Sequence, residues 1–235
     1  MDDKKTNQAN EDKGAESATQ DKIHWHEAFY EALQYELSNY KDYLIFENEK
    51  LLSKEALKMD VLIIKKSKDI RIEKNIGRIF EGHNIFEYKS ETDYLSVNDY
   101  NKVLGYALLY ASFEKISLSD VTISFAVSRH PRKLLKYLED ERQLKVEEVE
   151  AGIYYVTGDI ISIQILEQRK LSSGDNLFLK SLRSDVDSSD VYDIAELWEK
   201  EGWGRKNKFL EIVMRANKSK FREVSGMSAE LKKFL

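Results

Sequence analysis

Cysteine is absent from this chain of 235 residues, and histidine and proline are scarce. Without cysteine there is no disulfide, no thiolate zinc site and no cysteine nucleophile. The four histidines, His24, His26, His83 and His130, include no pair at the four-residue spacing of a zinc-binding helix. The composition therefore excludes chemistry based on thiols and on paired helical histidines. The lack of cysteine also fits a reducing cytoplasm.

Long apolar runs are missing as well. No stretch reaches the roughly 18 residues that a membrane-spanning helix needs, and no apolar segment of a secretory signal follows residues 1–5. Hydrophobic residues make up 42% of the chain and charged residues 34%, which is typical of a globular protein with a full core. We expect a cytoplasmic protein without a membrane partner.

The net charge is −5, which argues against a protein that coats nucleic acid without selectivity. The charges are nevertheless segregated along the chain. Residues 203–235 hold nine lysines and arginines against three acids, whereas residues 139–150 are acidic. Such a pattern can steer a polyanion to one side of a protein even when the total charge is negative.

We expect three segments along the chain. Residues 1–22 are polar and poor in apolar side chains, which predicts a disordered tail. Residues 23–172 mix helical and strand patterns, which predicts one α/β domain with a mixed sheet. Residues 173–235 predict a helical, basic extension, with helices over 190–200, 205–216 and 228–235.

Periodicity places the elements inside the domain. Apolar residues three and four apart predict helices over 24–41 and 97–114, and Pro131 opens a third helix. Residues 70–83 form an insertion between two strands. The β-rich runs predict strands over 44–47, 59–65, 84–89, 120–128, 153–157 and 160–167, the last two joined as a hairpin around Gly158.

An acid on one predicted strand is followed by an acid-x-lysine triplet on the next. Asp60 opens the apolar strand over 59–65, and Glu87-Tyr88-Lys89 ends the strand after it. Because residues two apart in a strand share a face, Glu87 and Lys89 stand side by side with Tyr88 behind them. Pairing of the two strands would bring Asp60 alongside.

This grouping is suited to a hard divalent cation. Mg²⁺ takes oxygen ligands, which Asp60, Glu87 and the carbonyl of Tyr88 can supply. Lys89, close to a cation and partly dry, would have a depressed pKa and would deprotonate or orient a water. Phosphodiester hydrolysis needs this combination of nucleophile, Lewis acid and charge stabilisation. A purely structural interpretation also stands, since surface strands often alternate glutamate and lysine for solubility.

With these residues in this context, the chain resembles the PD-(D/E)XK nuclease superfamily over residues 24–130. That family has a core of helix, three strands, helix and strand, with an acid on the second strand and (D/E)-x-K on the third. The matching positions are Asp60, Glu87 and Lys89, and Met59 replaces the proline of the family's name. The chain is similar in particular to an uncharacterised bacterial branch grouped with recombination-promoting nucleases and transposase-type proteins.

The resemblance implies a three-layer, restriction-endonuclease-like α/β core that cleaves DNA phosphodiesters with Mg²⁺, or with Mn²⁺ as a substitute. It also implies a metal-proximal glutamate on the first helix. Glu27, near the helix start, best matches that place, with Glu31 and Glu36 as alternatives. Glu36 falls inside the apolar stripe of this helix and would need a buried partner.

Two pairs of residues are candidates for contacts with the DNA backbone. Family members often carry polar or aromatic groups on the second core helix, where Lys102 and Tyr106 share a face with Asp99. Arg129 and Arg132 follow the fourth strand and, with Lys133 and Lys136, could form a phosphate-binding rim. For both pairs the alternative is an ordinary solvated helix face.

Three functions are open from the sequence. The first is a Mg²⁺-dependent deoxyribonuclease, for which a homodimer would be unsurprising because both strands of a duplex must be cut. The second is an inactive module of the same fold that binds DNA or a protein. The third is an interaction protein that uses the acidic residues 139–150 and the helical tail. Function does not follow from fold alone.

Overall fold

A computed structural model describes residues 25–48, 61–67, 70–201 and 207–224. Asp60, the predicted tail over 1–22 and the predicted helix over 228–235 lie outside the described residues.

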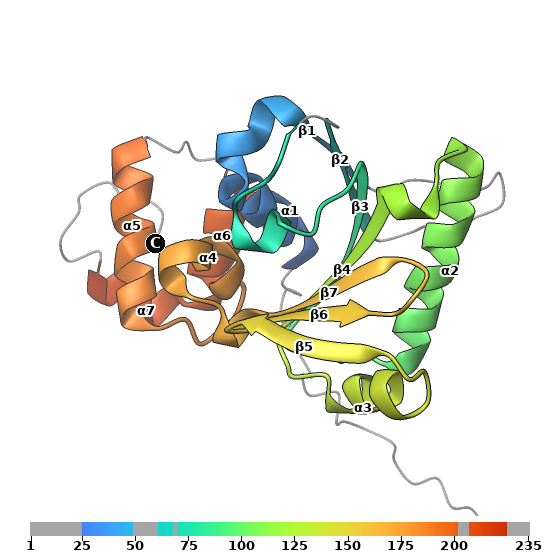
Figure 1. The fold of residues 1–235 in the computed structure, drawn as a ribbon. Helices are drawn as coiled ribbons and strands as arrows, with labels where there is room; N and C mark the ends of the chain where they lie inside the picture. Colours follow the sequence, from blue (N-terminus) through green and yellow to red (C-terminus); the bar gives the residue numbers. More distant parts are fainter. Residues whose placement is uncertain (1–24, 49–60, 68–69, 202–206, 225–235) are drawn as a thin grey trace, which may run out of the picture.

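Seven strands form one mixed sheet in the order β1-β2-β3-β4-β7-β6-β5 (Figure 1). The first three strands form an antiparallel meander, β3, β4 and β7 run parallel, and β7, β6 and β5 are again antiparallel. The strand bounds are β1 Leu44–Asn48, β2 Val61–Lys66, β3 His83–Lys89, β4 Val121–Val127, β5 Lys145–Glu150, β6 Ile153–Thr157 and β7 Ser162–Glu167.

Helices cover both faces of the sheet and make three layers (Figure 1). On one face, here called the α2 face, lie α2 and α3, and on the other, the α1 face, lie α1 and the helices that follow β7. The bounds are α1 Trp25–Glu36, α2 Val97–Glu114, α3 Arg132–Asp140, α4 Ser173–Lys180, α5 Ser188–Glu201, α6 Lys208–Ala216 and α7 Lys218–Val224. Short 3₁₀ helices are η1 Ser38–Tyr43, η2 Asn75–Gly77, η3 Leu118–Asp120 and η4 Gln168–Lys170.

Each face of the sheet has its own apolar core because strand side chains alternate between faces. Along β3, Ile85 joins the core of the α2 face, whereas Phe86 joins the core of the α1 face. All seven residues of β4 are buried, as expected for a central strand covered from both sides.

The insertion between β2 and β3 does not prevent these strands from pairing. They are antiparallel neighbours in the sheet. Ile72, Ile76 and Phe80 of the insertion are buried in the core of the α1 face. The buried amide of Gln164 on β7 donates to the carbonyl of Ile76 at 2.8 Å, which ties the insertion to the sheet.

The helices after β7 complete the α1 face. Buried side chains of α4, α5, α6 and α7 share one core with α1 and with the sheet. Polar contacts add to the packing, because Glu36 of α1 accepts the backbone N–H groups of Phe178 and Leu179 at 2.9 and 3.2 Å. The residues predicted as a helical extension thus form, where described, part of the same core.

The expected α/β class with a mixed sheet is confirmed, and the helix over 97–114 has the predicted bounds. One expectation about the elements was wrong, and one strand was not predicted. The first helix ends at Glu36 and is followed by the 3₁₀ helix η1, so the regular α-helix does not reach residue 41. The acidic residues 145–150 form the edge strand β5, which pairs with β6 and is largely exposed. Within the described ranges, no helix combines the length and apolar character needed to cross a membrane.

Candidate active site

The acid-x-lysine triplet occupies the carboxyl end of β3. Glu87 and Lys89 are in register with Phe125 and Val127 of β4, whose side chains belong to the core of the α2 face. Tyr88 points to the opposite face and stacks on Phe29 of α1 at 4.6 Å between ring centroids. The alternation expected of a strand therefore holds here.

Lys89 joins two carboxylates. Its Nζ lies 3.1 Å from Oε1 of Glu87 and donates to Oδ1 of Asp99 at 2.9 Å. Asp99 belongs to the first turn of α2, where it closes a capping box with Ser96. The Ser96 N–H and hydroxyl both donate to Oδ2 of Asp99, at 2.9 and 2.6 Å. The helix cap thus fixes the acid that holds Lys89.

The pair is shielded from water, since the side chain of Glu87 is 8% exposed and that of Lys89 is 18% exposed. Burial raises the pKa of Glu87 above its ordinary value, although the charges of Lys89 and Lys102 oppose the shift. Burial alone would lower the pKa of Lys89, but the hydrogen bond to Asp99 and the charge of Glu87 outweigh it, and the pKa is raised. Without a cation beside it, Lys89 is therefore a firmly held ammonium, and the depressed pKa expected for Lys89 close to a cation stays a prediction.

The two candidate residues of the second core helix, Lys102 and Tyr106, lie in different surroundings. Lys102 is exposed, and its charge lowers the pKa of Glu87, so it belongs to the electrostatic surroundings of the triplet. Tyr106 is buried in the core of the α2 face, with the Lys102 ammonium 5.5 Å from its ring centroid. The prediction that Tyr106 lies on the polar face of this helix is wrong, because that part of the helix packs against the sheet.

The glutamates of α1 face other partners than the triplet. Glu27 is exposed, and its carboxylate lies 3.9 Å from Nζ of Lys208 on α6. Glu31 accepts the N–H of Phe209 at 2.7 Å, near the start of α6. Glu36 is buried, as its place in the apolar stripe predicted, and it has a partner in the half-buried Lys74 at 2.8 Å. In these contacts all three glutamates join α1 to other segments on the α1 face.

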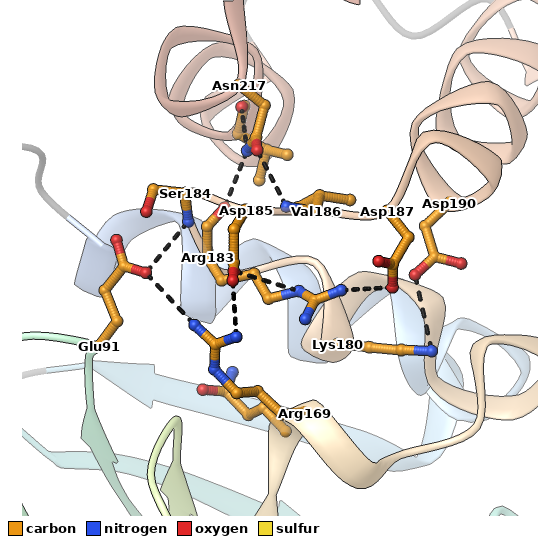
Figure 2. Close-up of polar contacts among 12 residues, drawn as sticks. Glu91, Arg169, Lys180, Arg183, Ser184, Asp185, Val186, Asp187, Asp190 and Asn217 are labelled. Atoms are coloured by element: carbon orange, nitrogen blue, oxygen red, sulfur yellow. Dashed lines mark hydrogen bonds and ion pairs between the residues drawn. The ribbon is translucent and has the colours of Figure 1, made fainter. Parts of the chain in front are cut away.

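The segment that leaves β3 is anchored to the link between α4 and α5 (Figure 2). Glu91 accepts the N–H of Ser184 at 3.2 Å and lies 3.9 Å from Arg169. Arg169 in turn donates to Asp185 at 2.7 Å. The triplet is therefore held on one side by the cap of α2 and on the other by this network.

Asp99 was not among the site residues predicted from the sequence, although it was placed on the same helix face as Lys102. The pattern Ser96-x-x-Asp99 ahead of an apolar run is a signal for a capping box. That signal predicts a fixed carboxylate, but not that Lys89 reaches it. Arg129 and Arg132 are both exposed, beyond the end of β4 and at the start of α3.

The fit of a divalent cation depends on a residue outside the described ranges. Among the described residues, no three acidic or histidine side chains are grouped so as to hold a metal ion. Glu87 supplies one carboxylate of the kind that Mg²⁺ prefers, and Asp99 is engaged by Lys89 and Ser96. Glu87 suits a hard cation only if a second acid joins it, and Asp60 is the candidate.

No family model matches this chain, and no curated protein and no solved structure matches it either.

Proposed function

We propose that this protein is a Mg²⁺-dependent DNA nuclease of the PD-(D/E)XK type, with its site at the carboxyl end of β3. The observation that carries the proposal is the Glu87–Lys89–Asp99 arrangement, a shielded carboxylate beside an ammonium that a second carboxylate holds in place. Chance alternation of charges on a surface strand would leave these groups in water, where such pairs contribute little.

The element order supports the proposal. From α1 to β4 the main elements are helix, three strands, helix and strand, the order that the resemblance implies. The first three strands are antiparallel and β4 is parallel to β3, with α2 as the connection. The carboxyl end of β3 and the start of α2 therefore lie at one edge, where Lys89 meets Asp99.

The proposal requires the side chain of Asp60 to lie on the same face of the sheet as Glu87. The described part of β2 starts at Val61, whose Cα partner is Glu87. A ladder continued without change by one residue would pair Asp60 with Tyr88 and turn its side chain to the α1 face. Asp60 can join Glu87 on the α2 face only if the chain departs from that regular register before Val61.

Each residue then has a defined role. The cation, held by Asp60, Glu87 and the Tyr88 carbonyl, would act as the Lewis acid on a phosphoryl oxygen. The Lys89 ammonium would orient the attacking water and stabilise charge on the phosphate, and Asp99 would fix its position. Lys102 would contact the DNA backbone on the α2 face, and Arg129 and Arg132 would do so beyond β4. Glu27 is exposed and lies beside Lys208 on the α1 face, so we give it no role in this scheme.

Nicking of supercoiled plasmid by purified protein tests the proposal. We expect relaxation in Mg²⁺ or Mn²⁺ and none in EDTA, and we expect Asp60→Ala and Lys89→Ala each to lose at least about 10²-fold in rate, the lower end for a positioned catalytic group. Lys145→Ala, at an exposed position of the edge strand β5, is the matched control and should cleave like the wild type. Cleavage retained in both site variants would refute the assignment.

A second candidate is an inactive module of the same fold that binds DNA. It is favoured by the engagement of Lys89 with two carboxylates, which makes a stable electrostatic unit without a metal. Isothermal titration with Mn²⁺ separates the two functions. The nuclease should take up metal and lose that uptake in Glu87→Gln, whereas the module should show no such heat.

A homodimer is the assembly that would let one binding event cut both strands of a duplex. Sedimentation of the free protein and of its DNA complex tests this part of the proposal. A monomer in both states, together with nicking but no linear product, would exclude it.

A further inference from the structure

A second polar cluster lies on the same face of the sheet as the triplet. It consists of His130 after β4, Tyr154 of β6, Glu167 at the end of β7 and Lys170 of η4. Nδ1 of His130 lies 2.7 Å from Oε2 of Glu167, and the Tyr154 hydroxyl donates to the same oxygen at 3.0 Å. Nζ of Lys170 lies 3.0 Å from that oxygen and donates to the Tyr154 hydroxyl at 2.6 Å.

The cluster and the triplet share one edge of the sheet. Lys89 is in register with Val127 on β4, and Val127 is in register with Glu167 on β7. These three positions end parallel neighbouring strands and point to the α2 face, because paired residues share a face. Two strand spacings separate Lys89 from Glu167, which is roughly 10 Å between their backbones.

The cluster is built around a carboxylate that is largely shielded from water. The side chain of Glu167 is 8% exposed, while His130 is 32% and Lys170 is 45% exposed. Burial would raise the pKa of Glu167, but the hydrogen bonds from His130, Lys170 and Tyr154 outweigh it and lower the pKa. Glu167 is therefore ionised at neutral pH, and it serves to hold two more exposed basic groups.

Of the two imidazole nitrogens of His130, only Nδ1 has a hydrogen-bond partner among the described residues. An ionised carboxylate only accepts hydrogen bonds, so Nδ1 carries the hydrogen that faces Glu167. No residue in the described part of the chain is hydrogen-bonded to Nε2, and the ring is partly exposed. A carboxylate that fixes one nitrogen of an imidazole and leaves the other for a ligand is a recurring arrangement at functional histidines.

The surroundings of His130 favour an anion. Arg129 and Arg132 flank it in the chain and are exposed. Lys170 contacts the same Glu167 oxygen as His130 does. The acid that acts on this cluster from a neighbouring strand is Glu148, whose charge bears on Tyr154. Lys170, Arg129 and Arg132 outnumber Glu167 and Glu148, so the charged residues named here carry a net positive charge.

We propose that His130, oriented by Glu167, binds a backbone phosphate of the DNA strand that is attacked at the triplet. A phosphate oxygen only accepts hydrogen bonds, so the binding form is the imidazolium, in which Nε2 carries a hydrogen as well as Nδ1. The inference rests on the proposed function, since it takes DNA as the ligand. The cluster and the triplet end strands that are roughly 10 Å apart, so one DNA strand that crosses this edge of the sheet can contact both. His130 is thus a binding residue that sets where the strand lies.

Two substitutions separate binding from a structural role. In His130→Asn the amide nitrogen takes the place of Nδ1 and keeps the bond to Glu167, but nothing remains at Nε2. In His130→Gln the amide nitrogen reaches the place of Nε2, while the contact with Glu167 is lost. Affinity for a duplex oligonucleotide is measured in EDTA as a function of salt, and the thermal midpoint is measured for each variant.

We expect His130→Asn to keep the wild-type thermal midpoint and to bind DNA several-fold more weakly at equal salt. The slope of log affinity against log salt should become shallower by up to about 0.9, the loss of one phosphate contact. His130→Gln should melt lower but bind more nearly like the wild type.

The opposite pattern, with His130→Asn binding like the wild type and with an unchanged slope, would overturn the inference. Absence of DNA binding by the wild type at low salt would overturn it as well. Failure of the proposed nuclease function is seen separately, as a plasmid that the wild type leaves intact in Mg²⁺ and Mn²⁺.

Discussion

Glu87 keeps a carboxylate in a place that water hardly reaches. Its neighbour Lys89 compensates the charge in part, but Lys89 is shared with Asp99, so burial still raises the pKa of Glu87. A folded-state pKa above the unfolded value means that the folded protein binds more protons in the window between the two. Stability therefore falls as the pH rises from the unfolded pKa of this group through its folded pKa.

Replacing Glu87 with glutamine should remove this dependence. We expect Glu87→Gln to be at least as stable as the wild type at pH 7 and to lose part of its relative advantage as the pH falls to 4, because the wild-type acid is then neutral. Thermal midpoints from pH 4 to 8 measure the difference. Glu147→Gln, on the exposed strand β5, is the control and should follow the wild type. The direction of the pKa shift would be contradicted if the stability gained by Glu87→Gln over the wild type were smaller at pH 7 than at pH 4.

Among the elements, α2 has the best-defined start. Ser96 accepts the N–H of Asp99 through its side chain, and Asp99 accepts the N–H of Ser96 in return. The same acid holds Lys89. The cap thus does two things at once, since it satisfies free N–H groups of the helix and positions a charge of the candidate site.

Removing this cap should reduce both the stability of the protein and its nicking activity. We expect Ser96→Ala to lower the free energy of unfolding by about 1 kcal/mol, the usual effect of an N-cap, and to slow nicking because Asp99 is less firmly held. Chemical denaturation and the plasmid assay measure the two effects. Ser172→Ala is the matched control, because Ser172 occupies the N-cap of α4 without a side-chain hydrogen bond. Equal stability losses in the two variants would contradict the role given to the cap.

At the scale of the whole molecule, α1 connects the sheet to the helices that follow β7. Its apolar side packs in the core of the α1 face, and its glutamates receive N–H groups from α4 and from the start of α6. Glu36 is the most enclosed of them, with a side chain 2% exposed and Lys74 at 2.8 Å. Its hydrogen bonds join segments about 140 residues apart in the chain.

Truncation of Glu36 should therefore weaken the entire fold. We expect Glu36→Ala to cost about 3 kcal/mol of unfolding free energy, because two backbone donors and one ammonium lose their acceptor in a buried place. Glu27→Ala, on the same helix but exposed, should change stability by no more than about 0.5 kcal/mol. Urea unfolding followed by circular dichroism measures both variants. A cost for Glu36→Ala as small as that of Glu27→Ala would show that the contact is not needed.

Local patterns in the sequence were sufficient for much of this protein. The spacing of apolar residues defines α2, the hairpin of β6 and β7, and the alternation that sets Glu87 and Lys89 side by side, because these features depend on neighbours in the chain. The strand β5 was not predicted by the same reasoning, because a charged, exposed edge strand has no alternation of apolar residues.

Contacts between distant segments were decided only by the tertiary structure. Lys89 meets Asp99 because the capped start of α2 lies beside the end of β3, and His130 meets Glu167 because β4 and β7 run parallel. The same packing gave Glu36 its partner and buried Tyr106. No spacing in the sequence encodes these pairs, because burial and charge compensation arise only when separate elements pack together.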